Sequence, residues 1–264
     1  MKIILITGST DGIGKLTALK LAKEGHKVYL HGRSSDKLAN TISEIKEESG
    51  NQNIDGFVAD FSDINAVKQM TEDVKAKVPK LDVLINNAGI FKTSAVSKFK
   101  GFDIRFVVNY LAAYALTNGI LQVLQNGDHT RIVNLSSAAQ SHVSDATLTG
   151  VTMHVASEAY AQSKLALTMW SFAFAKANPE IITIAVNPGS LLNTKMAKEA
   201  YGQHWSPAEK GVNILYDLAM SKDHENDSGK YFDNDKGTFA KAHPDAYDEG
   251  LINRLLTTTD SLLA

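Results

Sequence analysis

The octapeptide Thr7-Gly8-Ser9-Thr10-Asp11-Gly12-Ile13-Gly14 follows a short apolar run, Ile3–Thr7, and precedes a helical pattern, Leu16–Glu24. Glycine allows a tight turn and lets backbone N–H groups and the N-terminus of a helix approach a phosphate. A strand, a glycine turn and a helix in this order favour a nucleotide-binding α/β domain. The turn could also be only a structural connection, because its G-x-x-x-G-x-G spacing differs from the G-x-G-x-x-G dinucleotide fingerprint.

Short β-type runs alternate with helical patterns along the rest of the chain. The runs are nearly continuous in Ile, Val and Leu, as expected for strands covered on both faces. Repeated βαβ units with right-handed crossovers predict a doubly wound parallel sheet in a three-layer α/β/α domain spanning residues 1–264. The expected strands are Ile3–Thr7, Val28–His31, Ile54–Ala59, Val83–Asn86, Arg131–Leu135 and Ile181–Asn187. The expected helices are Leu16–Glu24, Asp36–Glu48, Ile64–Lys77, Val107–Leu124 and Ala159–Ala177.

Two less regular segments are expected to form loops at a substrate side. They are residues 138–156 and 190–225, and the second contains Ser206-Pro207-Ala208-Glu209, which reads as a capping box with proline at the first helical position. Apolar residues in the second segment suggest a lid over a hydrophobic substrate, although packing against the sheet edge explains them equally well. These residues are Leu191, Leu192, Tyr201 and Trp205.

Composition excludes several classes of function. The chain has 264 residues, 44% of them hydrophobic, which is enough for one large core. A net charge of −2 gives no reason to expect nucleic acid or an anionic membrane as partner. The absence of cysteine excludes thiolate metal sites and disulfides and fits a cytoplasmic location, and the eight histidines lack metal-like spacing. No apolar stretch has the length of a membrane span.

Tyr160 and Lys164, in the run Tyr160-Ala161-Gln162-Ser163-Lys164, carry the candidate chemistry. Residues four apart lie on one face of a helix. A cation beside a phenol favours the phenolate and lowers its pKa, so the tyrosine becomes a better proton donor at neutral pH. The pattern is common by chance, and its weight depends on the surrounding motifs.

Four motifs occur in one order along the chain: the glycine turn, Asn86-Asn87-Ala88-Gly89, the Tyr160/Lys164 pair and Asn187-Pro188-Gly189. Together they resemble the short-chain dehydrogenase/reductase family. The stretches Leu81–Gly89 and Ser228–Phe232 are similar to its retinol-dehydrogenase-like branch. The resemblance implies a Rossmann-type fold and an oxidoreductase that interconverts a ketone or aldehyde and an alcohol with a nicotinamide cofactor. It further implies a small, hydrophobic substrate and a homodimer or homotetramer formed through helices that include the Tyr160 helix.

The resemblance also assigns roles to individual residues. Tyr160 would be the general acid/base, Lys164 would lower its pKa and bind the nicotinamide ribose, and Asn109 would hold a water of the proton relay. Ser137 would orient the substrate oxygen, with the adjacent Ser136 as its competitor. The residues assigned to the cofactor are Gly8, Ser9, Asp11, Gly12, Ile13, Gly14, Arg33, Asp60, Asn87, Ala88, Gly89, Tyr160, Lys164, Pro188, Gly189 and Thr194.

The end of the second strand predicts the choice of cofactor. NAD-preferring relatives place an acid there to bind the adenosine ribose, whereas this chain has Gly32 followed by Arg33. A guanidinium pairs well with a 2′-phosphate, so we expect NADP(H) in preference to NAD(H). Asp60 matches an acid near the adenine, and its alternative role is to cap the helix that begins near Ile64.

Two departures from the family pattern mark this chain. Between Ser137 and Tyr160 lie 22 residues, more than compact members carry, which suggests a substrate loop. The threonine expected four residues after Gly189 is replaced by Asn193, with Thr194 one position later, so the nicotinamide contact falls to Thr194 or Asn193. The alternative function is a catalytically silent, NADP(H)-responsive binding protein, and a sugar-nucleotide epimerase is disfavoured by the glycine spacing.

Overall fold

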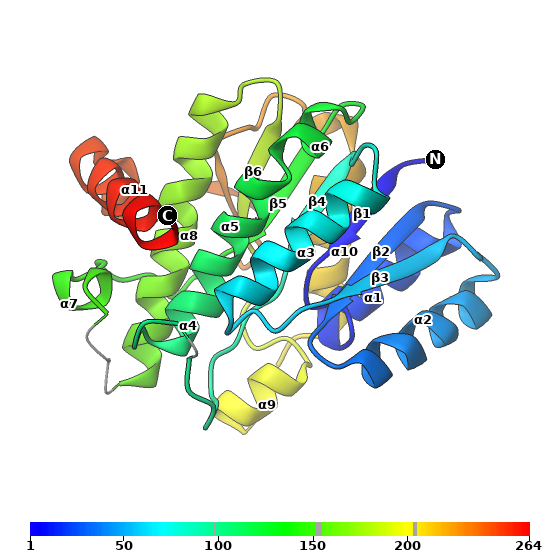
Figure 1. The fold of residues 1–264 in the computed structure, drawn as a ribbon, viewed down its shortest axis with the longest axis horizontal. Helices are drawn as coiled ribbons and strands as arrows, with labels where there is room; N and C mark the ends of the chain where they lie inside the picture. The colour runs from blue at the N-terminus through cyan, green and yellow to red at the C-terminus, as the bar shows by residue number, and fades with distance from the viewer. Residues whose placement is uncertain (98, 151–154, 203–204) are drawn as a thin grey trace.

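A mostly parallel sheet forms the middle layer of the computed structural model, which describes residues 1–97, 99–150, 155–202 and 205–264 (Figure 1). The strand order is β3-β2-β1-β4-β5-β6-β7-β8, and only the β7–β8 pair is antiparallel. The chain crosses over between β3 and β4, so the carboxyl ends of β1 and β4 border the topological switch point, where open α/β sheets have their ligand-binding cleft. The strands are β1 (Ile3–Ile6), β2 (Lys27–Gly32), β3 (Ile54–Val58), β4 (Val83–Asn86), β5 (Arg131–Leu135), β6 (Ile182–Asn187), β7 (Tyr231–Asp233) and β8 (Thr238–Ala240).

Helices cover both faces of the sheet because alternate strand residues point to opposite sides. Ile4 and Ile6 join the core beneath α1 (Gly12–Lys23), α2 (Ser35–Ser49) and α10 (Ala208–Met220). Leu5, between them, joins the core beneath α3 (Ile64–Lys77), α5 (Ala112–Gly119) and α8 (Ala156–Ala177). The shorter and peripheral elements are α4 (Ile104–Phe106), the π-helical turn η1 (Val107–Leu111), α6 (Leu121–Gln125), α7 (Asp145–Leu148), α9 (Lys195–Tyr201), the 3₁₀ turns η2 (Lys222–His224) and η3 (Pro244–Tyr247), and α11 (Glu249–Leu263). The three-layer, single-domain α/β/α fold is as predicted.

Several local predictions are wrong. The helix expected over Val107–Leu124 is interrupted, because a π-helical turn lies between α4 and α5 and a break at Ile120 separates α6. Ser206 does not cap α10, whose N-cap is Pro207. The Ser206 backbone is tied to the loop after β6 instead: its N–H donates to the Leu191 carbonyl (3.3 Å) and its carbonyl accepts from Asn193 N–H (2.8 Å).

The substrate-side segment predicted over 190–225 is too long. It contains α9, and it contains α10, whose Val212, Leu215 and Leu218 are buried in the core beside α1. The substrate-side role stays a prediction for the part of this segment that precedes α10. The segment predicted over 138–156 includes α7, and its residues 151–154 lie outside the described residues.

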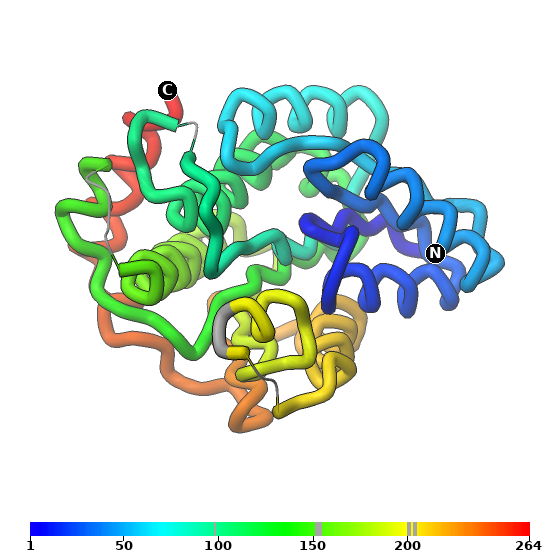
Figure 2. Tube along the Cα trace, turned by 90° about the horizontal axis from the view of Figure 1, so that it is seen from below, coloured from blue at the N-terminus to red at the C-terminus, as the bar shows by residue number. Residues whose placement is uncertain are grey.

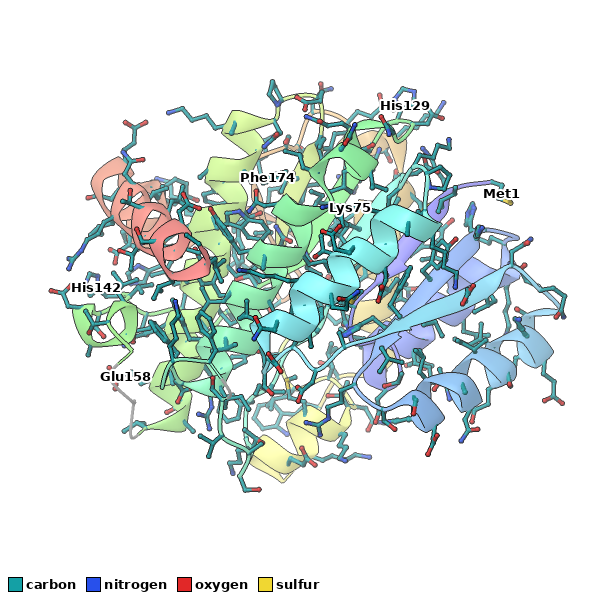
Figure 3. All side chains as sticks on the ribbon, viewed as in Figure 1. Met1, Lys75, His129, His142, Glu158 and Phe174 are labelled. Carbon is teal, nitrogen blue, oxygen red and sulfur yellow. The ribbon has the colours of Figure 1, made fainter. Side chains whose placement is uncertain are left out.

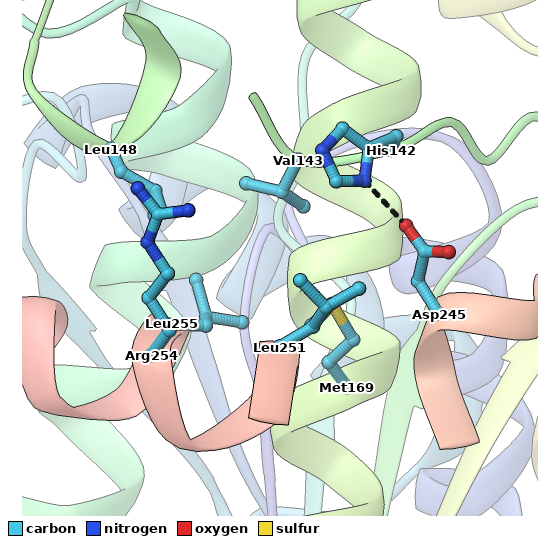
Figure 4. A pocket seen from close by; sticks show the side chains of 8 residues that line it. All are labelled: His142, Val143, Leu148, Met169, Asp245, Leu251, Arg254 and Leu255. Carbon is cyan, nitrogen blue, oxygen red and sulfur yellow. Dashed lines mark hydrogen bonds and ion pairs between the residues drawn. The ribbon is translucent and has the colours of Figure 1, made fainter. Parts of the chain in front are cut away.

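The C-terminal helix α11 packs against α8 and contacts the segment 138–156, which was predicted to lie at the substrate side. Leu251 and Leu255 face Met169 of α8, and His142 is paired with Asp245 at 2.7 Å (Figure 4). Arg254 is paired with Asp145 of α7 at 2.5 Å. Met169, Trp170 and Phe174 of α8 are all buried within the chain. Among the described residues, no helix has both the length and the apolar character needed to cross a membrane.

Candidate active site

The predicted site residues lie along one edge of the sheet, where the parallel strands end. Figure 3 labels Glu158, near the start of α8, at this edge, and His129, just before β5, at the opposite edge. Figure 2 views the molecule from the site edge, with α9 in front. The loops after β1, β2, β4, β5 and β6 all open here, so residues from distant motifs can share one cleft.

The glycine turn is packed against the segment that follows β4. Gly8 has φ +63°, and a Cβ built on it would lie 2.7 Å from Cα of Ala88. A Cβ on Gly14 would lie 2.4 Å from Nδ2 of Asn87. That amide donates to the carbonyls of Thr7 (2.8 Å) and Gly8 (2.9 Å). Glycine is needed at both positions because another segment of backbone or an amide occupies the space.

His31, a residue without a predicted role, holds the same turn from β2. Its Nδ1 accepts from Gly8 N–H (3.0 Å), and its Nε2 lies 3.0 Å from the Ala59 carbonyl. Burial lowers the pKa of His31 to about 4, so the ring is neutral and can accept at Nδ1 while it donates at Nε2. Ser9 completes the link, because its Oγ accepts from His31 N–H at 2.9 Å.

The N-terminus of α1 opens directly from this turn. Asp11 is the N-cap and accepts from Gly12 N–H at 2.8 Å. Its other oxygen pairs with Lys37 at 2.8 Å, and this hydrogen bond is the largest cause that lowers the pKa of Asp11. The exposed backbone N–H groups of a helix start are suited to a pyrophosphate.

Arg33 and the start of α2 follow the end of β2. Arg33 is exposed, and within the described part of the chain its guanidinium has no hydrogen-bond or ion-pair partner. The next residue, Ser34, is the N-cap of α2 and accepts from Lys37 N–H at 3.3 Å. Arg33 thus directly precedes a helix N-terminus whose first turn carries a lysine, and both kinds of group can bind a phosphate. The sequence interpretation did not name Lys37, although its place in the first turn of α2 was a usable signal.

Asp60 lies at the end of β3, on the same side of the cleft as Arg33. It is half-buried, and its Oδ1 accepts from the backbone N–H (3.0 Å) and the hydroxyl (2.8 Å) of Ser62. The alternative role as a helix cap is wrong, because the N-cap of α3 is Asp63, which accepts from Asn65 N–H at 3.0 Å. The role of Asp60 near the adenine stays a prediction.

Tyr160 and Lys164 lie one turn apart in the first half of α8. The Lys164 Nζ atom is 5.6 Å from the centre of the Tyr160 ring and donates to the Leu135 carbonyl at 2.7 Å. Lys164 is only 4% exposed, and burial lowers its pKa to about 8. The ammonium form therefore still dominates at neutral pH and stabilises a phenolate nearby.

Asn109 lies in the π-helical turn η1, a deformation that often marks functional positions. Its Oδ1 accepts from Ile90 N–H (2.8 Å), and its Nδ2 donates to the Ile90 carbonyl (3.1 Å) and to Ser163 Oγ (2.9 Å). Ser163 in turn donates to the Tyr160 carbonyl at 2.7 Å. The structure thus connects Asn109 to the turn of α8 that bears Tyr160, through a serine to which the sequence assigned no role.

The structure separates the two serines at the end of β5. Ser136 is 3% exposed, and its Oγ lies 2.6 Å from Thr168 Oγ1. Ser137 is partly exposed, and its Oγ accepts from Ala139 N–H at 3.1 Å. The segment then runs along α8, since Ser141 N–H donates to the Ala161 carbonyl at 3.4 Å. Of the two, Ser137 is the serine a substrate can reach.

The loop after β6 returns to the glycine turn. A Cβ built on Gly12 would lie 3.8 Å from Cγ2 of Thr194, the N-cap of α9. Asn193 is exposed, and its backbone is bound to Ser206. The additional residue is accommodated at Leu191, which has φ +50°. Thr194, not Asn193, is the residue that the structure brings to the cleft.

The two ends of the sheet edge carry different groups. The glycine turn and the start of α2 follow β1 and β2, whereas Ser137 follows β5, and the Lys164 Nζ atom, which donates to the Leu135 carbonyl of that strand, brings the Tyr160 helix to it. That division defines a class of protein, the oxidoreductases that use a nicotinamide nucleotide.

Comparison with known proteins gives the family. The family model described as short chain dehydrogenase matches residues 2–205. Mouse retinol dehydrogenase 13 is 31% identical over 285 aligned residues, covering 99% of this chain and 84% of that protein. Human polyprenol dehydrogenase is 31% identical, covering 90% of this chain and 78% of that protein.

Solved structures agree with these relatives. A short-chain dehydrogenase from Shigella flexneri, complexed with NADP, superposes with a TM-score of 0.73 at 25% identity and covers 89% of this chain and 97% of that chain. One from Escherichia coli, complexed with NADPH, has a TM-score of 0.73 at 26% identity over 88% of this chain and 96% of that chain. The chain belongs to the short-chain dehydrogenase/reductase family, in its retinol-dehydrogenase-like branch, and is an NAD(P)-dependent oxidoreductase that acts on CH–OH donors.

Proposed function

We propose that this enzyme uses NADP(H) to interconvert a hydrophobic ketone or aldehyde and its alcohol, with Tyr160 as the general acid/base. The observation that carries the proposal is the buried Lys164 ammonium, 5.6 Å from the centre of the Tyr160 ring and held by the Leu135 carbonyl. A cation fixed at this distance in a poorly solvated site lowers the cost of forming the phenolate. Tyr160 can then give its proton to a carbonyl oxygen and recover it in the reverse direction.

The nicotinamide, when bound, supplies the hydride. The other residues orient and connect: Ser137 holds the substrate oxygen, and Asn109 links the Ile90 backbone to Ser163 and so to the Tyr160 turn. Thr194 and the loop after Pro188–Gly189 would hold the nicotinamide half at the glycine turn. These roles require a fixed geometry, which the hydrogen bonds around Asn109 and Lys164 supply.

Arg33 and Lys37 support the preference for NADP(H). Arg33, which has no ion-pair partner among the described residues, directly precedes the N-cap of α2, and Lys37 follows in the first turn of that helix, where a 2′-phosphate would compete with Asp11 for the Lys37 ammonium. No acid stands at Gly32 to bind the free ribose hydroxyls of NAD(H). Charge and hydrogen-bond geometry therefore both favour the phosphorylated cofactor.

The substrate is proposed to be an apolar alcohol or aldehyde. The Phe91 ring packs edge-on against the Tyr160 ring at 4.8 Å, so the reacting carbonyl meets an aromatic wall. Exposed apolar side chains occur around the substrate side, at Val96, Val155, Met196 and Trp205. The names of the similar retinol and polyprenol dehydrogenases point to isoprenoid alcohols as the first compounds to try. The cytoplasmic location and the homo-oligomeric state stay predictions.

The decisive experiment is oxidation of NADPH, beside NADH, across a panel of retinoid, isoprenoid, steroid, quinone and short aldehydes and ketones. We expect turnover with NADPH and an apolar carbonyl, with a lower KM for NADPH than for NADH. A preference for NADH would contradict the cofactor assignment. Turnover confined to small polar carbonyls would contradict the substrate class.

A further inference from the structure

The turn between β7 and β8 is hydrogen-bonded to the loop that follows β6. Asp235 accepts from Ser190 N–H (2.8 Å) and from Ser190 Oγ (2.5 Å), and its Oδ2 also accepts from Asn187 Nδ2 at 2.9 Å. The neighbouring Asn234 donates from Nδ2 to the Pro188 carbonyl at 2.8 Å. One short turn thus holds both ends of the segment from Asn187 to Ser190.

The loop from Asn187 to Thr194 depends on contacts with other parts of the chain. It carries one residue more than the family pattern, and Leu191 takes φ +50°, a conformation that leucine rarely adopts. Directly after Ser190, the Leu191 carbonyl accepts from Trp205 N–H (3.0 Å), and the buried Leu192 packs against Gly211 of α10. The strained residue is therefore fixed between the Asp235 contacts on one side and the start of α10 on the other.

The position of this segment determines where Thr194 lies. Only a few residues join Ser190 to Thr194, whose Cγ2 is 3.8 Å from a Cβ built on Gly12. Because β6 lies beside β5, the loop borders the Tyr160 and Lys164 end of the cleft, whereas Arg33 marks the other end. A shift of Ser190 would therefore weaken binding of the nicotinamide half of a dinucleotide and leave binding of its adenosine half unchanged.

We propose that Asp235 is a positioning residue, which holds the extended loop Asn187–Thr194 in the register that places Thr194 at the glycine turn. The inference rests on the proposed binding of NADP(H). A carboxylate is suited to this place because both its oxygens accept, one from the Ser190 N–H and the other from the Ser190 hydroxyl and the Asn187 amide. Burial opposes the charge, but the hydrogen bonds from Ser190 and Asn187 and the nearby Lys210 lower the pKa of Asp235 overall.

Asp235→Asn tests the proposal, with Asp223→Asn as the matched control. The control removes the same charge from an exposed residue of η2 that makes no side-chain contact to this loop in the described part of the chain. Two ligands are titrated into each variant: NADPH, and 2′,5′-ADP, which carries only the adenosine half. Amide hydrogen exchange is measured for peptides that cover residues 187–202 without ligand.

In Asp235→Asn, we expect NADPH affinity to fall about tenfold to a hundredfold, the range for a lost hydrogen bond to a charged group. Affinity for 2′,5′-ADP should stay unchanged, and exchange over residues 188–194 should accelerate. Equal NADPH affinity in the two variants, or a parallel loss of both ligands in Asp235→Asn, would overturn the positioning role. If the native chain binds neither ligand, the proposed function fails; exchange without ligand then still decides whether Asp235 holds the loop.

Discussion

Replacing Gly8 with alanine tests the contact between the glycine turn and the segment after β4. Gly8 has φ +63°, which costs a residue with a side chain about 1–2 kcal/mol. The new Cβ would also lie 2.7 Å from Cα of Ala88, and relieving such overlap with backbone costs about 1–3 kcal/mol. We therefore expect Gly8→Ala to lower the free energy of unfolding by about 2–5 kcal/mol.

Gly25→Ala is the matched control for this change. Gly25 has φ +81°, but nothing lies within 4 Å of a Cβ built there, so only the conformational cost of about 1–2 kcal/mol applies. Both free energies are measured by urea unfolding followed by circular dichroism. NADPH titration should show weaker binding for Gly8→Ala alone, since Gly25 lies at the far end of α1. Equal unfolding free energies for the two variants would refute the packing argument.

Three further predictions concern charge. Arg33→Ala should weaken NADPH binding by about tenfold to a hundredfold and leave NADH binding unchanged, as measured by fluorescence titration; a parallel loss of both would contradict a 2′-phosphate site. For the native enzyme, kcat/KM for carbonyl reduction should fall as pH rises through about 8, because Lys164 then loses its proton; a flat profile there would contradict its role. His224 is partly buried, which lowers its pKa, but hydrogen bonds to Asp217 (2.9 Å) and Asp227 (3.0 Å) raise the pKa overall. Its stabilisation is complete below the unfolded pKa of about 6.5 and is lost as pH rises through the raised folded value, so urea unfolding of His224→Gln should lack this pH dependence.

The central strands and their helices could be predicted because their signal is local. Strands such as Val83–Asn86 are buried on both faces and therefore apolar throughout, and the bounds of this strand and of Ile64–Lys77 agree with the structure. The edge hairpin of β7 and β8 escaped prediction because each strand has three residues and pairs only through the fold. Helix α9 escaped for a similar reason, since its seven residues are fewer than the window of about 11–18 residues in which apolar periodicity can identify a helix.

The candidate site divides in the same way. Tyr160 and Lys164 are one helical turn apart, and the glycine turn is continuous in sequence, so both could be identified from spacing. The hydrogen bonds made by His31, Ser163 and Asp235 join strands and helices that are distant in sequence, so no local pattern predicts them. The family pattern favoured Ser137 over Ser136, and the exposure of the two side chains agrees with that choice, since Ser136 is buried and Ser137 is partly exposed.

The most direct test of the account is carbonyl-dependent oxidation of NADPH by Tyr160→Phe beside the native enzyme, with NADPH affinity measured on both. The account predicts that turnover falls by at least about a hundredfold while NADPH binds as before, because only the proton donor has been removed. Substantial residual turnover in Tyr160→Phe would contradict Tyr160 as the general acid/base. A native chain that binds NADPH yet reduces no carbonyl would instead favour a catalytically silent, cofactor-responsive protein.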